Sequence, residues 1–234
     1  MTEEEFRSSL RSTQSSLQMI GLLRSPQPYR SLSPSDEFVD ATRRYQTKYP
    51  DLYRIGLRNV DYNFLLADYS FLQFARNVSS SAVPYGLRYA FYPNPFDAPS
   101  YEDYCGENDW DMSDPASADL FYQLLDESSW DISVPVVRYE VSFSQYRPLV
   151  HPAAHFHIGM HSENRWPTDK ILTPLAFSLL VGKLFYPEEW RQENVFSTGD
   201  VGLLDRRMLT EKAACEAVPD SHFDENERKL FFFT

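Results

Sequence analysis

Two stretches of the sequence decide the fold: Val137-Arg138-Tyr139-Glu140-Val141 and His151-Pro152-Ala153-Ala154-His155-Phe156-His157-Ile158-Gly159-Met160-His161. In the first, apolar and charged residues alternate, which is typical of a half-buried β-strand. A turn at 146–148 separates the two stretches, so the second is expected to return as the antiparallel partner of the first. We therefore predict paired strands over 135–144 and 153–161.

Four of the five histidines lie in the second stretch, all at odd positions, so an extended backbone directs them to one side. The two-residue repeat of a strand predicts that His155 and His157 lie within about 7 Å of each other. Imidazole titrates near neutral pH and suits proton transfer. We predict His155, His157 and Glu140 as catalytic residues, while a purely structural role for the histidines stays open.

Three arginines are expected to accompany these residues. Arg88 lies in a similar alternating segment, Arg138 is on the strand of Glu140, and Arg165 follows the histidines. Guanidinium groups bind phosphate and stabilise its charge during reaction. Arg88, Arg138 and Arg165 are therefore the predicted substrate-binding residues.

Metal binding is the alternative for the histidines. His155 and His157 could hold zinc with His151 or His161 as a further ligand, although the thiolates of many structural zinc sites are missing. The acidic segment 97–114 lacks the spacing of an EF-hand loop. The prediction for the histidine site includes no metal, and the pattern specifies no cofactor.

Further segments extend the predicted sheet in both directions. Residues 61–76 alternate as one long strand or a hairpin bent near Asp68, and residues 85–92 form another strand. Helical patterns precede and follow them: Thr2 with Glu5 forms a capping box for a first helix, and a second helix that begins at Ser35-Asp36 is expected to end before Pro50. We predict one α+β domain over 1–234 with an antiparallel sheet. A helical part (1–58), a sheet part (59–165) and a C-terminal helical part (166–234) follow one another along the chain.

The composition limits the possible partners. The 234 residues contain 34 acidic and 22 basic side chains, a net charge of −12. Such a surface repels nucleic acid unless a local basic groove binds it. We see no secretory leader and no long apolar run, which predicts a cytoplasmic protein without a membrane segment. The aromatic loop residues predict a protein partner or a homo-oligomer.

A wider set of segments resembles a bacterial family known only as a domain of unknown function. They are Asp61-Tyr62-Asn63-Phe64, Asp68 to Phe74, Leu87-Arg88-Tyr89, Val137 to Glu140, His151 to Gly159, Arg165-Trp166-Pro167 and Thr173 to Phe177. The arginine–tyrosine strands followed by HxH are also weakly similar to small bacterial growth-arrest toxins, with Glu140 in place of their Asp. The likeness implies a role in bacterial antiphage defence or in a toxin–antitoxin system.

Two functions follow from these observations. The first is a phosphodiesterase or nuclease in which His155 and His157 act as general acid and base. The second is a non-catalytic acidic subunit of such an assembly, in which the histidines stabilise the sheet and the surface binds a partner protein.

Overall fold

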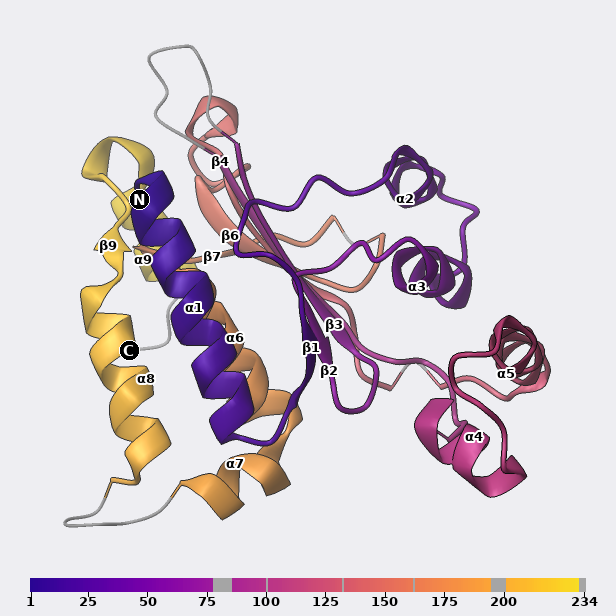
Figure 1. The fold of residues 1–234 in the computed structure, drawn as a ribbon. Helices are drawn as coiled ribbons and strands as arrows, with labels where there is room; N and C mark the ends of the chain where they lie inside the picture. Colours follow the sequence, from indigo (N-terminus) through magenta and orange to yellow (C-terminus); the bar gives the residue numbers. More distant parts are fainter. Residues whose placement is uncertain (78–85, 100, 132, 162, 195–200, 232–234) are drawn as a thin grey trace.

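The computed structural model describes residues 1–77, 86–99, 101–131, 133–161, 163–194 and 201–231. At its centre is a seven-stranded antiparallel sheet in which each strand pairs with the next strand along the chain. Helices cover both of its faces (Figure 1). The predicted α+β class, an antiparallel sheet covered by N-terminal and C-terminal helices, is confirmed.

The sheet consists of β1 (Leu23–Pro26), β2 (Phe64–Leu66), β3 (Phe71–Asn77), β4 (Gly86–Tyr92), β5 (Val137–Val141), β6 (Ala154–Ile158) and β7 (Trp166–Pro167), and a second pair is formed by β8 (Lys170–Ile171) and β9 (Glu216–Ala217). The helices are α1 (Glu3–Met19), α2 (Asp36–Arg43), α3 (Tyr49–Arg58), α4 (Tyr101–Asn108), α5 (Pro115–Glu127), α6 (Pro174–Phe185), α7 (Pro187–Glu193), α8 (Leu203–Ala214) and α9 (Glu225–Phe231).

Helices α1 and α6 cover one face of the sheet, and α8 packs on the outer side of α6. Helix α1 begins at the predicted capping box, in which the Thr2 hydroxyl accepts a hydrogen bond from the Glu5 N–H. Phe6 of α1 and Phe177 of α6 are fully buried against Tyr89 of β4. These aromatic contacts hold a helix from the N-terminal part and a helix from the C-terminal part of the chain against the same face of the sheet.

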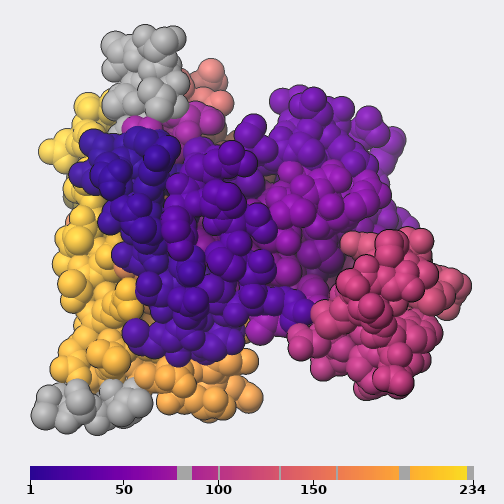
Figure 2. Space-filling view, in the orientation of Figure 1, coloured from indigo at the N-terminus to yellow at the C-terminus, as the bar shows by residue number. Residues whose placement is uncertain are grey.

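Helices α2 and α3 cover the opposite face. Here Phe38, Tyr53, Phe71 and Tyr92 form a second buried cluster. The packing leaves no space beside Gly56 of α3, where a Cβ atom would lie 2.7 Å from the Phe71 ring. Helices α4 and α5 form a lobe that projects beyond this face, shown in pink in Figure 2.

The structure adds elements to each predicted part. The N-terminal helical part also contains strand β1 and helix α3; Pro50 lies in the first turn of α3, although it was expected to end the preceding helix. Of the two alternatives for 61–76, the structure shows the hairpin, which turns at Asp68, and the acidic segment contains α4. Strand β7 falls in the predicted C-terminal helical part. None of the described helices is both long and apolar enough to cross a membrane.

Tyr139 links β5 to the C-terminal segment through its hydroxyl. This group donates to the Lys170 carbonyl at 2.9 Å and accepts from the Leu172 N–H at 3.0 Å, and the residue is fully buried. Tyr139→Phe leaves both backbone groups without this partner and is expected to lower the unfolding free energy by about 1–3 kcal/mol. Urea denaturation measures the change. Tyr45→Phe is the control, since Tyr45 is 84% exposed; equal midpoints for the two variants would contradict the prediction.

Candidate functional site

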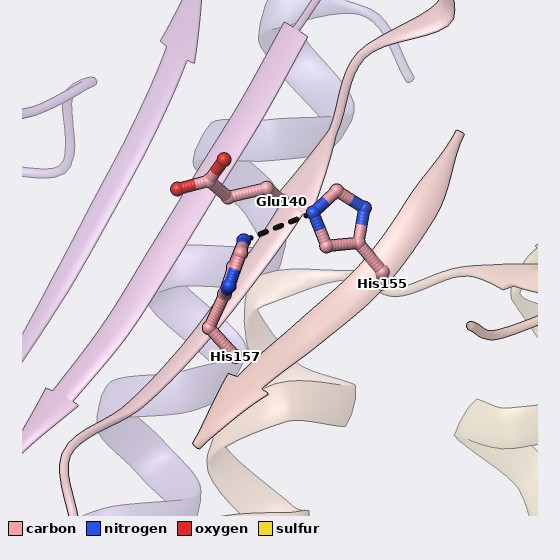
Figure 3. A group of neighbouring side chains, drawn as sticks. All are labelled: Glu140, His155 and His157. Carbon is pink, nitrogen blue, oxygen red and sulfur yellow. Dashed lines mark hydrogen bonds between the residues drawn. The ribbon is translucent and has the colours of Figure 1, made fainter. Parts of the chain in front are cut away.

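The pairing of β5 with β6 brings three of the predicted residues together. In this register Glu140 lies opposite His155 and Arg138 lies opposite His157. Figure 3 shows Glu140, His155 and His157 projecting from the two strands toward one another. One side-chain ligand atom from each of the three lies within 4.8 Å of the others. The rings of His155 and His157 have centroids 4.8 Å apart, which confirms the predicted proximity on one face.

The two imidazoles are joined directly. Their Nε2 atoms are 3.0 Å apart, and the Nδ1 atom of His155 lies 2.8 Å from the carbonyl oxygen of Pro152. Because a carbonyl only accepts hydrogen bonds, Nδ1 of neutral His155 carries the proton and Nε2 carries a lone pair. In the hydrogen-bonded pair, His157 Nε2–H therefore donates to His155 Nε2.

Burial keeps this pair away from water. His155 is fully buried and His157 is 6% exposed, whereas the Glu140 side chain retains 26% of its surface. Burial, followed by the neighbouring His157, lowers the pKa of His155 to about 4. His155 is consequently a neutral imidazole at physiological pH.

All three predicted arginines lie around the pair. Arg88 of β4 is opposite Glu140, and its Nε atom is 3.7 Å from Glu140 Oε1. Arg138 is the cross-strand neighbour of His157 on one side. On the other side, the β6–β7 register continued by one residue sets Arg165 opposite His157. The Nε atoms of Arg138 and Arg165 are buried and have no hydrogen-bond partner within the described part of the chain.

A cavity of about 390 Å³ adjoins the site at the edge of the sheet. It is lined by Ser144, Gln145, Arg147, Val150, His151 and Arg165. The ring of His151 meets that of His155 edge-on, with centroids 5.0 Å apart. Buried His151 Nδ1 lacks a hydrogen-bond partner among the residues described. The cavity is thus a basic region next to the buried pair, and His151 separates it from His155.

Sequence reasoning missed Arg147. Its backbone exchanges both hydrogen bonds with His151, so a tight turn sets the two residues side by side. The Tyr146-Arg147-Pro148 turn was the available signal. His161, in contrast, is separate from the cluster: its Nε2 contacts the Thr47 carbonyl at 3.1 Å and its ring packs on Tyr45.

The lowered pKa of His155 predicts how stability depends on pH. The unfolded state binds a proton near pH 6.5, whereas the folded state resists protonation down to about pH 4. The unfolding free energy should therefore be highest above pH 6.5 and fall by at most about 3 kcal/mol toward pH 4. Denaturation in chelator-containing buffer measures this slope. His155→Gln should flatten it and His222→Gln should retain it; identical slopes in both variants would contradict the assignment.

The chain also matches a family model. No curated protein and no solved structure matches it, but the model described as "Uncharacterized conserved protein (DUF2290)" matches residues 31–234. This range contains Arg88, Glu140, Arg165 and both central histidines. The expected membership of a family known only as a domain of unknown function is confirmed, and the likeness to growth-arrest toxins stays a prediction. The chain belongs to the DUF2290 family of conserved proteins.

Proposed function

We propose that this protein hydrolyses phosphodiester bonds and that Glu140, His155 and His157 form its reaction centre. The observation that carries the proposal is the 3.0 Å contact between two imidazole nitrogens beside a carboxylate that is itself in contact with Arg88. Hydrolysis requires groups that move protons and groups that stabilise negative charge. The cluster contains both kinds.

The imidazole pair suits proton transfer. His155 is neutral at physiological pH and its Nε2 lone pair faces His157. A neutral imidazole accepts a proton, and once protonated it can donate that proton to a leaving oxygen. Glu140 is the most exposed of the three residues. Among the predicted arginines, Arg88 is the one that contacts its carboxylate. Water would therefore reach the cluster beside this carboxylate.

The arginines suit the phosphate. Arg138 and Arg165 flank His157, and Arg165 also lines the cavity that contains Arg147 and His151. A phosphodiester in this cavity would contact guanidinium groups on two sides. This is a local basic region on a chain with a net charge of −12, which favours a short or single-stranded substrate over a long duplex.

We further propose that the protein acts in bacterial antiphage defence or in a toxin–antitoxin system. The support is the sequence pattern of arginine–tyrosine strands followed by HxH. Figure 3 includes the histidines of that pattern, His155 and His157, and Glu140, the residue that takes the place of the toxins' Asp.

The test is hydrolysis of RNA, DNA, dinucleotides and bis(p-nitrophenyl) phosphate by the purified chain. Glu140→Gln and His157→Gln should each lower kcat/KM by about 100-fold, the effect typical of losing one acid–base group. His222→Gln is the matched control, because this histidine lies in a separate turn against Phe143 and Tyr146. Absence of hydrolysis of every substrate, or equal activity in all three variants, would reject the proposal.

A second candidate function is binding of a partner protein without catalysis. An apolar cavity of about 440 Å³ opens at the β7 edge of the sheet, and three exposed apolar side chains surround it: Ile158, Trp166 and Leu184. Exposed aromatic and aliphatic groups of this kind anchor protein interfaces. Among the loop aromatics expected to serve as anchors, Tyr92 and Phe96 are instead buried in the core, whereas Trp110 is 37% exposed.

Partner binding predicts that Trp166→Glu disrupts an assembly and leaves the fold intact. Light scattering on the purified chain detects a homo-oligomer, and co-purification with the products of neighbouring genes detects a heteromeric complex. A monomer that binds none of these products would exclude this second function.

A further inference from the structure

We propose that Glu140, His155 and His157 bind a divalent transition-metal ion of the zinc type. This goes beyond the acid–base roles assigned to the three residues from sequence, which included no metal. The binding site stands on its own geometry; the part that the ion plays in catalysis rests on the proposed function.

The positions of the donor atoms suit such an ion. The two Nε2 atoms face each other at 3.0 Å, and a Glu140 oxygen completes a group with all separations within 4.8 Å. Zinc bonds to nitrogen at about 2.0–2.1 Å, so two tetrahedral imidazole ligands stand about 3.3 Å apart. The imidazoles need to separate by only a few tenths of an ångström, and the proton on His157 Nε2 must move to Nδ1 to leave a lone pair for the ion. The partly exposed Glu140 side chain can close the remaining distance by rotation about its χ angles.

The surroundings of the donors are those of a metal site. The Nδ1–H of His155 donates to the Pro152 carbonyl at 2.8 Å, which directs the Nε2 lone pair toward His157 and Glu140. Metal-binding histidines commonly hold their second ring nitrogen in this way. Arg88 contacts the Glu140 carboxylate from the neighbouring strand and orients it similarly.

The kind of ligand selects the ion. Two imidazoles and one carboxylate favour zinc and related transition metals over magnesium or calcium, which prefer oxygen ligands. Three protein ligands leave a fourth tetrahedral position for water, the arrangement of hydrolytic zinc sites. The set lies on two adjacent, well-paired strands, so its geometry is fixed by the sheet and requires no loop to order.

At this site the ion would supply the nucleophile for phosphodiester hydrolysis by lowering the pKa of its bound water. The water oxygen forms a bond to phosphorus, and the bond from phosphorus to the leaving oxygen breaks. One proton of the water passes to the leaving oxygen and the other to solvent. Arg138 and Arg165 would stabilise the charge on the phosphate oxygens. The reaction consumes only water and needs no redox partner.

The experiment is metal binding by the full chain after removal of bound ions with a chelator. Equilibrium dialysis should give one Zn²⁺ per chain, and Co²⁺ should give the visible absorption of a four-coordinate site with nitrogen ligands. Glu140→Gln and His157→Gln should weaken Zn²⁺ binding at least about tenfold and reduce the Co²⁺ band. His222→Gln should leave both unchanged. Circular dichroism checks that each variant is folded. If His157→Gln does not fold, the result for Glu140→Gln decides the test.

The outcomes separate this inference from the proposed function. A folded wild-type chain without stoichiometric Zn²⁺ binding, or equal binding in Glu140→Gln, overturns the metal site. If the metal site is overturned and hydrolysis persists in the presence of the chelator, the proposed function holds with acid–base chemistry alone. Zn²⁺ binding that depends on Glu140, with no hydrolysis of any substrate, supports the metal site and rejects the proposed function.

Discussion

The register between β5 and β6 is the constraint on which the rest of the structure depends. It pairs Tyr139 with Phe156 on the face covered by α1 and α6, and Glu140 with His155 on the face covered by α2 and α3. A shift by one residue would exchange the two faces, burying ionisable groups in the aromatic core. The ring contact of Tyr139 with Phe156, at 5.1 Å between centroids, and the Tyr139 hydroxyl bonds oppose that shift.

Local sequence signals predicted the elements whose stability is local. The Thr2–Glu5 capping box specified the start of α1, and alternation of side chains specified β4, β5 and β6. The elements that the sequence did not predict had no such local signal. Strand β1 contains Leu23-Arg24-Ser25-Pro26, which has no period and is defined by its pairing with β2. Pro50 is compatible with the end of one helix and the beginning of the next.

The sequence predicted which residues form the candidate site better than it predicted what surrounds them. Alternation alone set Glu140, His155 and His157 on one face, with Arg138 beside them. The depth of the pair was not predictable, because residues outside the two strands, such as His151 against the His155 ring, enclose it only in the folded chain. Side-chain rotation decides the Nε2–Nε2 contact, and a period of two carries no information about it.

The order of the strands has a consequence for how the molecule is made. Every strand of the large sheet pairs with its successor in the chain, so each new strand finds its partner already synthesised. The hairpin of β5 and β6 closes over residues 142–153, a separation along the chain that costs little entropy compared with distant contacts. Helix α1, in contrast, lacks its partner α6 until late in synthesis. During that interval the apolar side of α1 has no α6 to cover it. Its protection from aggregation would depend on the ribosome's surroundings or on chaperones.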